Sequence, residues 1–489
     1  FEIKKRGNDF EFGGDAKFVI DNSLTLDLTV NPDFSQVEVD QQVTNLTRFE
    51  ISLPEKRQFF IENSDLFSQL GNGREARPFF SRRIGIAKDL DGNNIQNKIN
   101  AGLRLSGNLN NKLRIGILNM HTSADIQNEI SAYNNSIFIL QQKMFSRSNL
   151  NAFIISRDAT GNYDFLSNNE KFNRVVGFDY NLRDANSNWN GKYYFHKSFS
   201  PENNDDSTSF GISTTYESTN ISLRAAGSYI GENFRSDLGF IRRTDIIKLY
   251  PEIRYTFWPE DAKLINHSFE VTPVYIFKPS LNNEISDYYI ISKWDGALRD
   301  SSRINFTMWN RFTYLYDEFD PTGTNNGNPL PANSGYHYTN FDFSFDSDDS
   351  KDFTYRINPS FGKFYNGHKT SFDLELSQRI RPKFTSSVEM KYDRVKLPQP
   401  YSSANIFLIA PRFDFTFTKN LYWATLLQYS NQSDNLSLNA RLQWRFAPLS
   451  DLFLVYNDNY FTENRYDSIF IPRVTNRSIN LKLTYWLDI

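Results

Sequence analysis

Apolar and polar residues alternate along most of this chain. In the final segment, 479–489, the apolar positions are every second residue and the residues between them are polar, except for Trp486. A period of two places one set on each face of a β-strand. The same alternation recurs in five further stretches, 24–30, 339–345, 372–376, 413–417 and 436–446. The pattern predicts an all-β protein built from amphipathic strands, and no stretch indicates a helix.

The length of these strands indicates a membrane barrel. Each runs for about ten residues or more, the length that a tilted strand needs to cross a bilayer, whereas strands in soluble proteins usually have about five or six. A chain that ends on an amphipathic strand with a final apolar residue is typical of outer-membrane barrels. A helical membrane protein is excluded, because apolar runs such as 406–410 fall far short of the ~18 residues that a spanning helix needs.

The connections between strands alternate between short and long. The short ones are 108–111, 145–148, 185–188, 347–350, 381–383, 418–420 and 447–450. The long ones are 88–97, 123–134, 158–171, 200–206, 317–335, 395–404 and 463–473. Outer-membrane barrels have short periplasmic turns and long external loops. The chain is therefore predicted to form a single transmembrane antiparallel up-and-down β-barrel over residues 1–489. We expect about 24 strands (roughly 22 to 26), as even closure prefers, provided that 231–245 is an external or infolded loop.

One early segment breaks the alternation. Residues 31–78 show no sustained period of two, and the order of short and long connections places them on the periplasmic side. A barrel of this predicted size has a wide lumen, and barrels near this size are typically plugged. Residues 32–78 are therefore predicted to be a plug-like insert, on the periplasmic side or in the lumen.

Composition supports the predicted barrel and limits the classes of partner that are expected. Aromatic residues are 16% of the chain and hydrophobic residues only 39%, which suits a wall with one face in lipid and the other in water. The net charge of −3, with scattered basic residues, gives no indication of nucleic-acid binding. The absence of cysteine excludes disulfides and Cys-based zinc sites. We expect outer-membrane lipid as a partner, the outer membrane of a Gram-negative bacterium as the location, and a mature or truncated chain that starts at Phe1.

The most motif-like stretch lies inside the predicted insert. It consists of Pro54, Glu55, Lys56, Arg57, Phe59, Phe60, Glu62 and Asn63. As a plug or gate, its charges would bind lumen side chains. As a structural brace, Glu55 and Arg57 would pair with wall residues above the two packed phenylalanines. Buried charges must be paired to be tolerated, so both interpretations predict salt bridges. Arg82 and Arg83 are predicted to open the next wall strand and to offer a partner for Glu55 or Glu62.

No catalytic residues, metal ligands or cofactor are expected. The five histidines show no metal-ligand spacing, and neither a GxSxG elbow nor a P-loop is present. The KDLDGNN stretch of 88–94 resembles a calcium loop, but its glycine is misplaced and its twelfth position is Asn100 instead of Glu. The acidic run 346–352 falls on a predicted periplasmic turn, where solvated side chains are the default. Loops rich in amide and aromatic residues, such as 317–338, leave saccharide capture open.

Four runs of the chain resemble the signature of a known family. They are Leu24–Glu38, Leu46–Glu50, Pro54–Asn63 and Ser81–Gly85. In this order they resemble a Bacteroidetes-type family of envelope proteins of unknown function. Its members are described as a carbohydrate-binding-module-like N-terminal domain followed by a large conserved C-terminal domain, and some are loosely labelled membrane-associated hydrolases. The resemblance implies that this chain corresponds to the C-terminal domain, without the N-terminal one, and it supplies no catalytic residues.

Three functional interpretations follow. The first is a plugged outer-membrane pore or transporter for a saccharide or peptide. The second is a non-enzymatic scaffold or accessory subunit of a multi-protein outer-membrane assembly, whose partners are other outer-membrane or periplasmic proteins. The third, which rests only on the family resemblance, is an outer-membrane hydrolase. The first is preferred, and the chain is expected not to be an enzyme.

Overall fold

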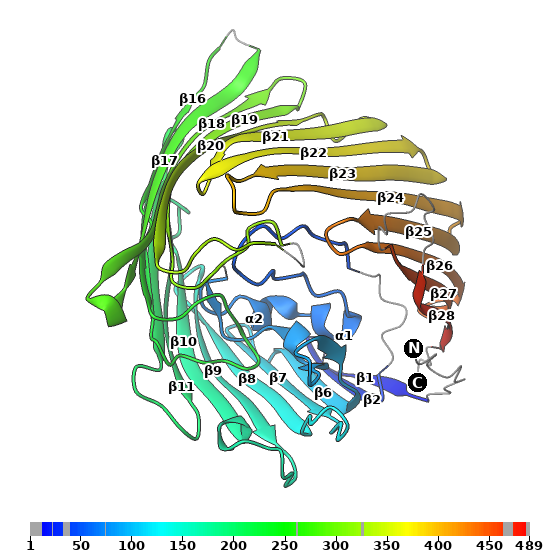
Figure 1. The fold of residues 1–489 in the computed structure, drawn as a ribbon. Helices are drawn as coiled ribbons and strands as arrows, with labels where there is room; N and C mark the ends of the chain where they lie inside the picture. The colour runs from blue at the N-terminus through cyan, green and yellow to red at the C-terminus, as the bar shows by residue number, and fades with distance from the viewer. Residues whose placement is uncertain are drawn as a thin grey trace.

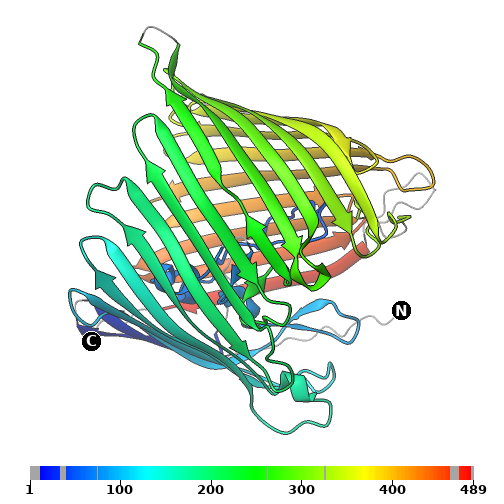
Figure 2. The ribbon, with the colours of Figure 1, turned by 90° about the vertical axis from the view of Figure 1, so that its left-hand side faces the viewer.

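A computed structural model describes residues 12–21, 23–32, 40–73, 75–260, 263–323, 327–462 and 473–485 of the chain. Almost all of the regular structure is β, and it forms one antiparallel sheet of 24 strands. The sheet curves round into a barrel (Figure 1), with long strands tilted relative to its axis (Figure 2). The predicted all-β barrel and its strand number are confirmed. Residues 33–39 of the predicted insert and 486–489 of the final predicted strand lie outside the described residues.

The strands of the wall follow one another round the barrel nearly in chain order. The first are β1 (Gly14–Asp21), β2 (Leu24–Val30), β6 (Ile99–Asn108), β7 (Leu113–Thr122), β8 (Tyr133–Met144), β9 (Ser148–Ala159), β10 (Phe172–Arg183) and β11 (Trp189–Phe199). The next are β12 (Thr208–Glu217), β13 (Ile221–Ile230), β15 (Ile246–Leu249), β16 (Glu252–Phe257), β17 (Leu264–Lys278), β18 (Glu284–Leu298), β19 (Arg303–Leu315) and β20 (Ser334–Asp346). The last are β21 (Phe353–Phe364), β22 (Gly367–Ile380), β23 (Phe384–Lys396), β24 (Ala404–Thr418), β25 (Leu421–Ser430), β26 (Asn435–Ala447), β27 (Ser450–Phe461) and β28 (Arg473–Thr484).

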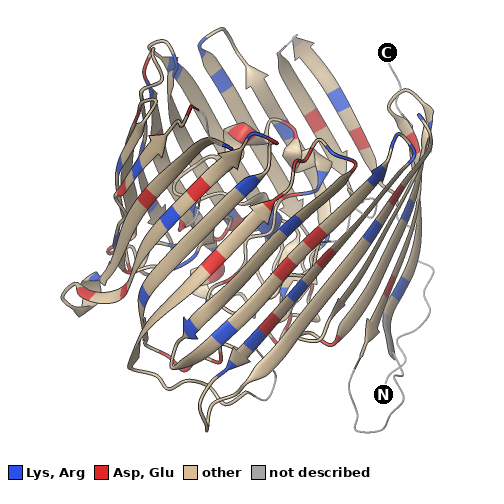
Figure 3. Cartoon of the chain, turned by 90° about the horizontal axis from the view of Figure 1, so that it is seen from above, with Lys and Arg blue, Asp and Glu red and all other residues tan. Residues whose placement is uncertain are grey.

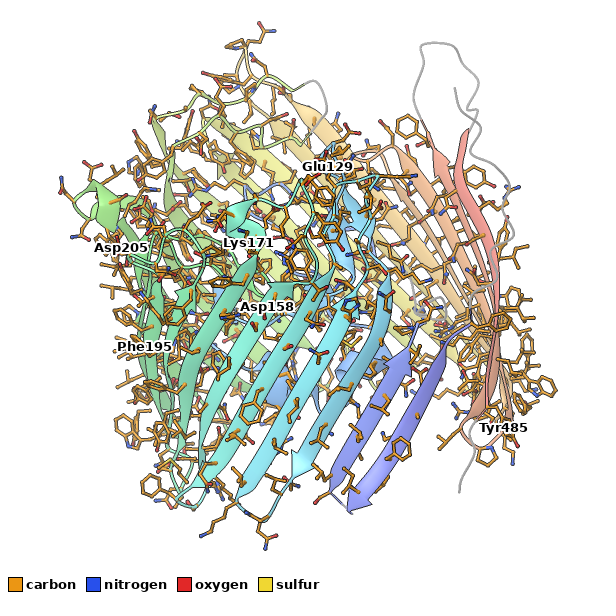
Figure 4. The ribbon with its side chains drawn as sticks, turned by 90° about the horizontal axis from the view of Figure 1, so that it is seen from below. Glu129, Asp158, Lys171, Phe195, Asp205 and Tyr485 are labelled. Carbon is orange, nitrogen blue, oxygen red and sulfur yellow. The ribbon has the colours of Figure 1, made fainter. Side chains whose placement is uncertain are left out.

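Alternation along each strand separates an outer apolar face from an inner face. In β16, Ile253 is 61% exposed, and its cross-strand neighbour on β17, Val271, is also exposed, whereas Arg254 beside it pairs with Glu270 on the inner side. Figure 4 shows Phe195 and Tyr485 on the outside of the ring, and both side chains are exposed. Positions of Lys, Arg, Asp and Glu are spread over many of the strands (Figure 3). The wall therefore presents apolar and aromatic side chains outward along its length.

The two ends of the barrel differ in their connections. At one end, here the turn end, the connections are short throughout, for example 109–112, 184–188 and 419–420. At the other end, here the loop end, they include the long segments 160–171, 231–245 and 316–333. The segment 231–245 is an infolded loop, as the predicted strand order requires, because its β14 (Phe240–Ile241) pairs with β3 (Ala76–Arg77) away from the wall.

The insert between β2 and β6 is longer than predicted and enters from the other end. Val30 pairs opposite Ala101 at the loop end, so 31–98 leaves and rejoins the wall there, not at the end with short turns. Within it lie α1 (Gln58–Ile61), α2 (Ser64–Ser68), β3, η1 (Ser81–Arg83), and the hairpin of β4 (Ile86–Lys88) and β5 (Asn94–Gln96). Figure 1 shows this blue segment inside the ring of strands.

The predicted wall strand after residue 78 is wrong, and its loss accounts for the change of end. Residues 81–83 form a 3-10 turn, and Gly85 follows with a φ of +82° that extended backbone does not adopt. The next wall strand begins only at Ile99. Successive strands of an up-and-down barrel run in opposite directions. The prediction placed one extra strand between the insert and β6. Without that strand, the insert connects to the wall at the loop end and not at the turn end.

Candidate functional site

An apolar contact holds the insert against one part of the wall. Phe60, Leu66, Phe67 and Leu70 of the insert are buried in one cluster, which also contains wall side chains. The wall members are Ile99, Leu118, Met120, Ile137, Ile139, Phe153, Ile155, Val175, Ile230, Ile246, Val274 and Ile276. Gly116 on β7 allows the closest approach, since a Cβ there would lie 2.7 Å from both the Leu66 and Phe67 side chains. These strands are apolar on both faces because the inner face meets protein.

A buried arginine links the insert to three wall strands. Arg104 on β6 is 1% exposed. It donates to Asp27 on β2 at 2.7 Å, to the main-chain oxygen of Glu62 at 2.6 Å, and to the Glu62 carboxylate at 3.2 Å. Lys17 on β1 donates to the same Glu62 carboxylate and lies 3.9 Å from Asp27. Two wall cations and one wall carboxylate thus converge on a single insert carboxylate.

Within the predicted motif, Glu55 and Arg57 brace the insert internally. The two side chains form a bidentate pair, with Arg57 Nε 2.9 Å and Nη2 2.8 Å from the Glu55 oxygens. Arg57 also donates to the main-chain oxygens of Ser81 and Ile84, each at 2.8 Å, and the Ser81 hydroxyl donates to Glu55 at 2.6 Å. The Arg57 guanidinium lies over the Phe60 ring at 4.2 Å. Glu55 and Arg57 therefore fix the 54–63 segment to the 81–84 turn, and not to the wall as the brace interpretation expected.

The remaining motif residues have separate contacts. Asn63 donates to the Ser106 hydroxyl of β6 at 3.0 Å, and the Phe59 ring lies 5.3 Å from both the Phe60 ring and the Arg104 guanidinium. The Pro54 carbonyl accepts from Arg82 at 2.9 Å. Lys56 lies 3.8 Å from Asp40. The motif is thus brought together with the wall mainly through Glu62 and Asn63.

The predicted wall partners Arg82 and Arg83 are not on the wall. Both lie in the 3-10 turn of the insert. Arg82 pairs with Asp40, and Arg83 donates to Glu50 at 2.6 Å and to the Gly239 carbonyl at 3.0 Å. Neither contacts Glu55 or Glu62, because those carboxylates are taken by Arg57 and by Arg104 with Lys17.

Sequence reasoning missed a second buried contact, at residues 69–73. The Gly71 amide donates to Asp179 on β10 at 2.7 Å. The other Asp179 oxygen lies 2.7 Å from His196 Nε2 on β11, and Lys192 Nζ is 3.3 Å from the carboxylate. Asp179 and His196 are both fully buried. A Cβ on Gly71, whose φ is +65°, would lie 2.5 Å from the Ala76 oxygen, so this turn admits only glycine.

A third contact joins the insert to β15 and β18 through a chain of charges. Glu75 is 1% exposed, and Lys248 on β15 donates to it at 2.6 Å. Arg243 lies 3.5 Å from Glu75 and donates to Asp287 on β18 at 2.9 Å. Arg48 of the insert completes the chain, because its Nη2 donates to both Asp287 oxygens, at 2.7 and 2.9 Å. The available sequence signal was the presence of inward-facing charges, such as Lys248, on otherwise apolar strands.

The insert carboxylates are held in the charged form. Burial by itself raises the pKa of Glu75, but Lys248 and Arg243 beside it outweigh burial, so its pKa lies below the ordinary value. Burial raises the pKa of Glu55 as well, and the hydrogen bonds and charge of Arg57 lower it further than burial raises it. For Glu62, Lys17 and Arg104 likewise overcome burial and lower the pKa. Above acidic pH, Glu62 and Glu75 therefore favour attachment of the insert to the wall, and Glu55 favours the brace inside the insert.

A polar cavity of about 920 Å³ remains between the insert and the wall. The insert contributes 68–73, and the wall contributes inner-face residues of β10 to β18. Its charged lining consists of Lys192, Arg224, Lys248, Arg254, Lys293, Glu252 and Glu270, and its aromatic lining of Tyr194, Tyr250 and Tyr289. The cations are matched by carboxylates, for example Arg254 by Glu270 and Lys293 by Asp295. The cavity can hold a polar solute without a large net charge.

No metal site emerges from the described part of the chain. It contains no group of three His, Asp or Glu side chains that could hold an ion. In the KDLDGNN loop, the Asp89 carboxylate accepts from the amides of Asp91 and Asn93, which is the geometry of a polar turn. Nor does the described structure contain a helix long and apolar enough to cross a membrane.

The fold and the insert define a class of protein: a large antiparallel β-barrel whose lumen contains a segment from its own chain. Within that class, the family model described as a domain of unknown function (DUF5916) matches residues 2–407, so the chain belongs to this family. The family resemblance of the sequence is thereby confirmed. No curated protein matches the chain. A solved structure of P. aeruginosa FpvA bound to a heterologous pyoverdine and iron is 10% identical, covers 79% of this chain and 69% of that chain, and has a TM-score of 0.45.

Proposed function

We propose that this protein is an outer-membrane barrel that passes a small hydrophilic solute, a saccharide or a peptide, through a lumen narrowed by the insert. Strands of ten to fifteen residues, such as β7 and β17, match a tilted membrane crossing. Outward apolar residues such as Ile253, Phe269 and Leu481 suit lipid contact. Near the turn end, Trp444, Phe446 and Tyr485 are exposed; Trp444 meets Phe446 edge to face, and Phe446 stacks on Tyr485, as side chains of an interfacial aromatic girdle do.

The cavity beside residues 68–73 is the main observation that supports transport. A closed structural core would be apolar throughout, but about half of this space is lined by paired charges, amides and tyrosines, and the rest by apolar residues such as Leu70, Val274 and Ile291. Tyrosine faces and paired Arg and Glu side chains offer stacking and hydrogen bonds to a solute rich in hydroxyl or amide groups. Each of the five lining cations is paired with a carboxylate, which supports a neutral or zwitterionic solute. Two of these carboxylates, Glu252 and Glu270, belong to the lining, and the others are Asp179, Glu75 and Asp295. The proposal assigns the chain no catalytic step.

Liposome swelling with graded solutes tests the proposal. Vesicles with the wild-type protein are expected to admit only small sugars and short peptides. A variant in which a Gly/Ser linker replaces 40–98 is expected to admit larger ones, since the insert no longer narrows the lumen. An empty-vesicle sample and a heat-denatured sample control for leakage. Vesicles that stay impermeable with both proteins would contradict transport.

The insert's attachment favours a second candidate function, a scaffold or accessory subunit. Three separate buried charge contacts, at Arg104, Asp179 and Glu75, fix the insert to the wall. A plug that moves in each transport cycle would have to break all of them. In this alternative, the insert is permanent and the loops bind other outer-membrane or periplasmic proteins. Co-purification of stoichiometric partners in gentle detergent, together with impermeable vesicles, is the expected result for a scaffold.

A further inference from the structure

A second cavity, of about 440 Å³, lies in the part of the insert that packs against β6 and β7. It is bordered by the segments 52–55 and 77–81 and by α1 and α2, which Figure 1 shows inside the ring of strands. Its apolar lining includes Phe60, Ile61, Phe67, Phe79 and Phe80. Three of the phenylalanines are at most 5% exposed, whereas Ile61 is 47% exposed. The cavity thus combines a buried aromatic side with an edge that is open to solvent.

Arg77 gives this cavity one positive charge that no described carboxylate neutralises. Of the charged side chains in the lining, Glu55 and Arg104 are neutralised by the ion pairs described above. Arg77 forms no ion pair with the described residues, and its Nη2 donates only to the Ser52 hydroxyl, at 2.7 Å. Its Nε is buried and has no hydrogen-bond partner. An anion is therefore the group that this side of the cavity lacks.

The position of Arg77 is fixed by its neighbours. Its backbone pairs with Phe240 of the infolded loop, and its guanidinium lies over the Phe80 ring at 4.3 Å. Burial lowers the pKa of Arg77, and no neighbouring carboxylate raises it. An arginine nevertheless stays charged at every physiological pH. The insert therefore holds a permanent cation, partly removed from water, beside an apolar cavity, and such a cation is stabilised when an anion binds to it.

We propose that this cavity binds a small amphipathic acid, whose carboxylate pairs with Arg77 and whose apolar body lies among the phenylalanines. The planar guanidinium offers a fork of donors that matches a carboxylate. A single uncompensated charge selects one anionic group, and the aromatic side chains select an apolar body. The volume of about 440 Å³ lies within the range of small-molecule sites, roughly 300–1,000 Å³.

This site differs from the polar cavity beside residues 68–73. Ser68 of α2 lines both cavities, but the cations of the polar cavity are paired with carboxylates, whereas Arg77 is not. The inference goes beyond the proposed transport and does not rest on it, because the site belongs to the insert and to its contacts with β6 and β7. Half of the 54–63 motif residues line this cavity or flank it, so the motif has a role here besides the Glu55–Arg57 brace.

Isothermal titration calorimetry of the full chain in lipid nanodiscs tests this assignment. The probes are 4-phenylbutyrate and its neutral counterpart 4-phenylbutanamide, which share an apolar body and differ in charge. Wild-type protein is expected to bind the acid at least about tenfold more tightly than the amide, as hydrogen bonds between charged groups imply. Arg77→Met should bind the two probes with equal affinity, close to that of the wild type for the amide. Nanodiscs without protein correct for partition of the probes into lipid.

Three further variants separate this cavity from the rest of the insert. Arg83→Met removes a cation that pairs with Glu50 outside the cavity lining, and it should bind both probes like the wild type. Arg77→Lys keeps the charge without the fork of donors and should retain part of the preference for the acid. Ser64→Leu fills part of the cavity from α2 and should weaken binding of both probes.

Two other acids distinguish the sources from which such a ligand could come. Octanoate and N-acetylphenylalanine share the carboxylate and the apolar body that the cavity recognises. Tighter binding of octanoate would assign a straight acyl chain, and tighter binding of N-acetylphenylalanine would assign the carboxyl end of a short peptide.

Other results would overturn the proposal. Wild-type protein that binds neither probe, or binds acid and amide equally, would show that the cavity is not a site for an amphipathic acid. Acid binding that Arg77→Met leaves unchanged would place the carboxylate elsewhere. If Arg77→Met loses both probes because the cavity is disrupted, Arg77→Lys decides, and a lost preference for the acid in that variant would overturn the assignment. Liposome swelling is measured separately, so the failure of transport and the failure of this site are distinguishable.

Discussion

The two halves of the barrel wall differ in what their inner faces meet. Strands β6 to β17, here the insert-facing half, contribute twelve buried apolar residues to the cluster under the insert. Strands β20 to β27, here the open half, have in their middle only the small cluster of Leu408, Ala410 and Leu426. Their inner face carries exposed ion pairs instead, such as Arg356 with Glu375. One sheet thus behaves as a protein core on one side and as a water-facing wall on the other.

This difference teaches how the chain specifies the position of its insert. A strand that faces lipid outside and water inside must alternate, whereas a strand that faces lipid outside and protein inside is apolar on both faces. β8 and β9 contain the runs Ile137–Leu140 and Ala152–Ile155, which are apolar without a break. β22 alternates strictly over 372–376 and β26 over 436–446. Loss of alternation along a wall strand therefore marks an inner face that is covered by apolar side chains. The run 406–410 of β24 fits this rule, since Ile406 is buried in a cluster with Leu46 of the insert.

The largest expected effect comes from breaking the buried charge contact in the insert-facing half. Arg104→Met leaves Asp27 and Glu62 without their arginine in a buried site, which typically costs about 3–5 kcal/mol. The matched change in the open half, Arg356→Met, removes a half-exposed pair and should cost only about 0.2–1 kcal/mol. The free energies of urea unfolding in lipid vesicles measure both. Equal losses of unfolding free energy in the two variants would contradict the difference between the two halves of the wall.

A smaller effect is expected from filling the space under the insert. Gly116→Val places methyl groups where Leu66 and Phe67 already lie, and overpacking of this kind costs about 1–3 kcal/mol. Gly14→Val is the control, since nothing lies within 4 Å of a Cβ at that position. Limited proteolysis of the folded protein should cut the insert faster in Gly116→Val and leave Gly14→Val like the wild type. Unchanged cleavage in Gly116→Val would show that the insert does not pack there.

Attachment of the insert should weaken in acid. The pKa of Glu75 is lower in the folded protein than its ordinary value of 4.5, so its contribution is complete above that value and is lost as pH falls through the lowered value. Protease release of the insert should therefore accelerate below about pH 4.5. In the Glu75→Gln variant, protease should release the insert faster at neutral pH, and the release rate should depend less on pH. A wild-type release rate that stays flat down to pH 3 would contradict the buried pairing.

The smallest effect is expected at the surface of the insert. Arg83→Ala removes a pair with the half-exposed Glu50, which is worth at most about 1 kcal/mol. Its urea midpoint should lie close to that of the wild type. A loss of stability to urea as large as that of Arg104→Met would show that Arg83 anchors the insert, as the sequence predicted.

The sequence was sufficient for the wall but not for the insert. Strands such as 372–376 and 436–446 were predictable because each side chain's environment repeats with a period of two. The insert has no such period, and its contacts join residues far apart in the chain, such as Gly71 with Asp179 and Glu75 with Lys248. Arg82 and Arg83 were predicted to open a wall strand, and the local signal against this was Gly85. Whether a carboxylate such as Glu55 pairs within the insert or with the wall depends on tertiary packing that spacing does not encode.

The central claim is that residues 57–84 of the insert lie in the lumen against one half of the wall. An electron cryo-microscopy map of the native protein in a lipid nanodisc tests it most directly. The account predicts density for residues 57–84 against the inner face of β6 to β17, joined to the wall at Arg104, Asp179 and Lys248. Only the start of the insert reaches the open half, where Gln42 bonds Gln428 on β25 and Asn435 on β26. A map that places residues 57–84 outside the barrel, or packs them against β20 to β27, would contradict the account.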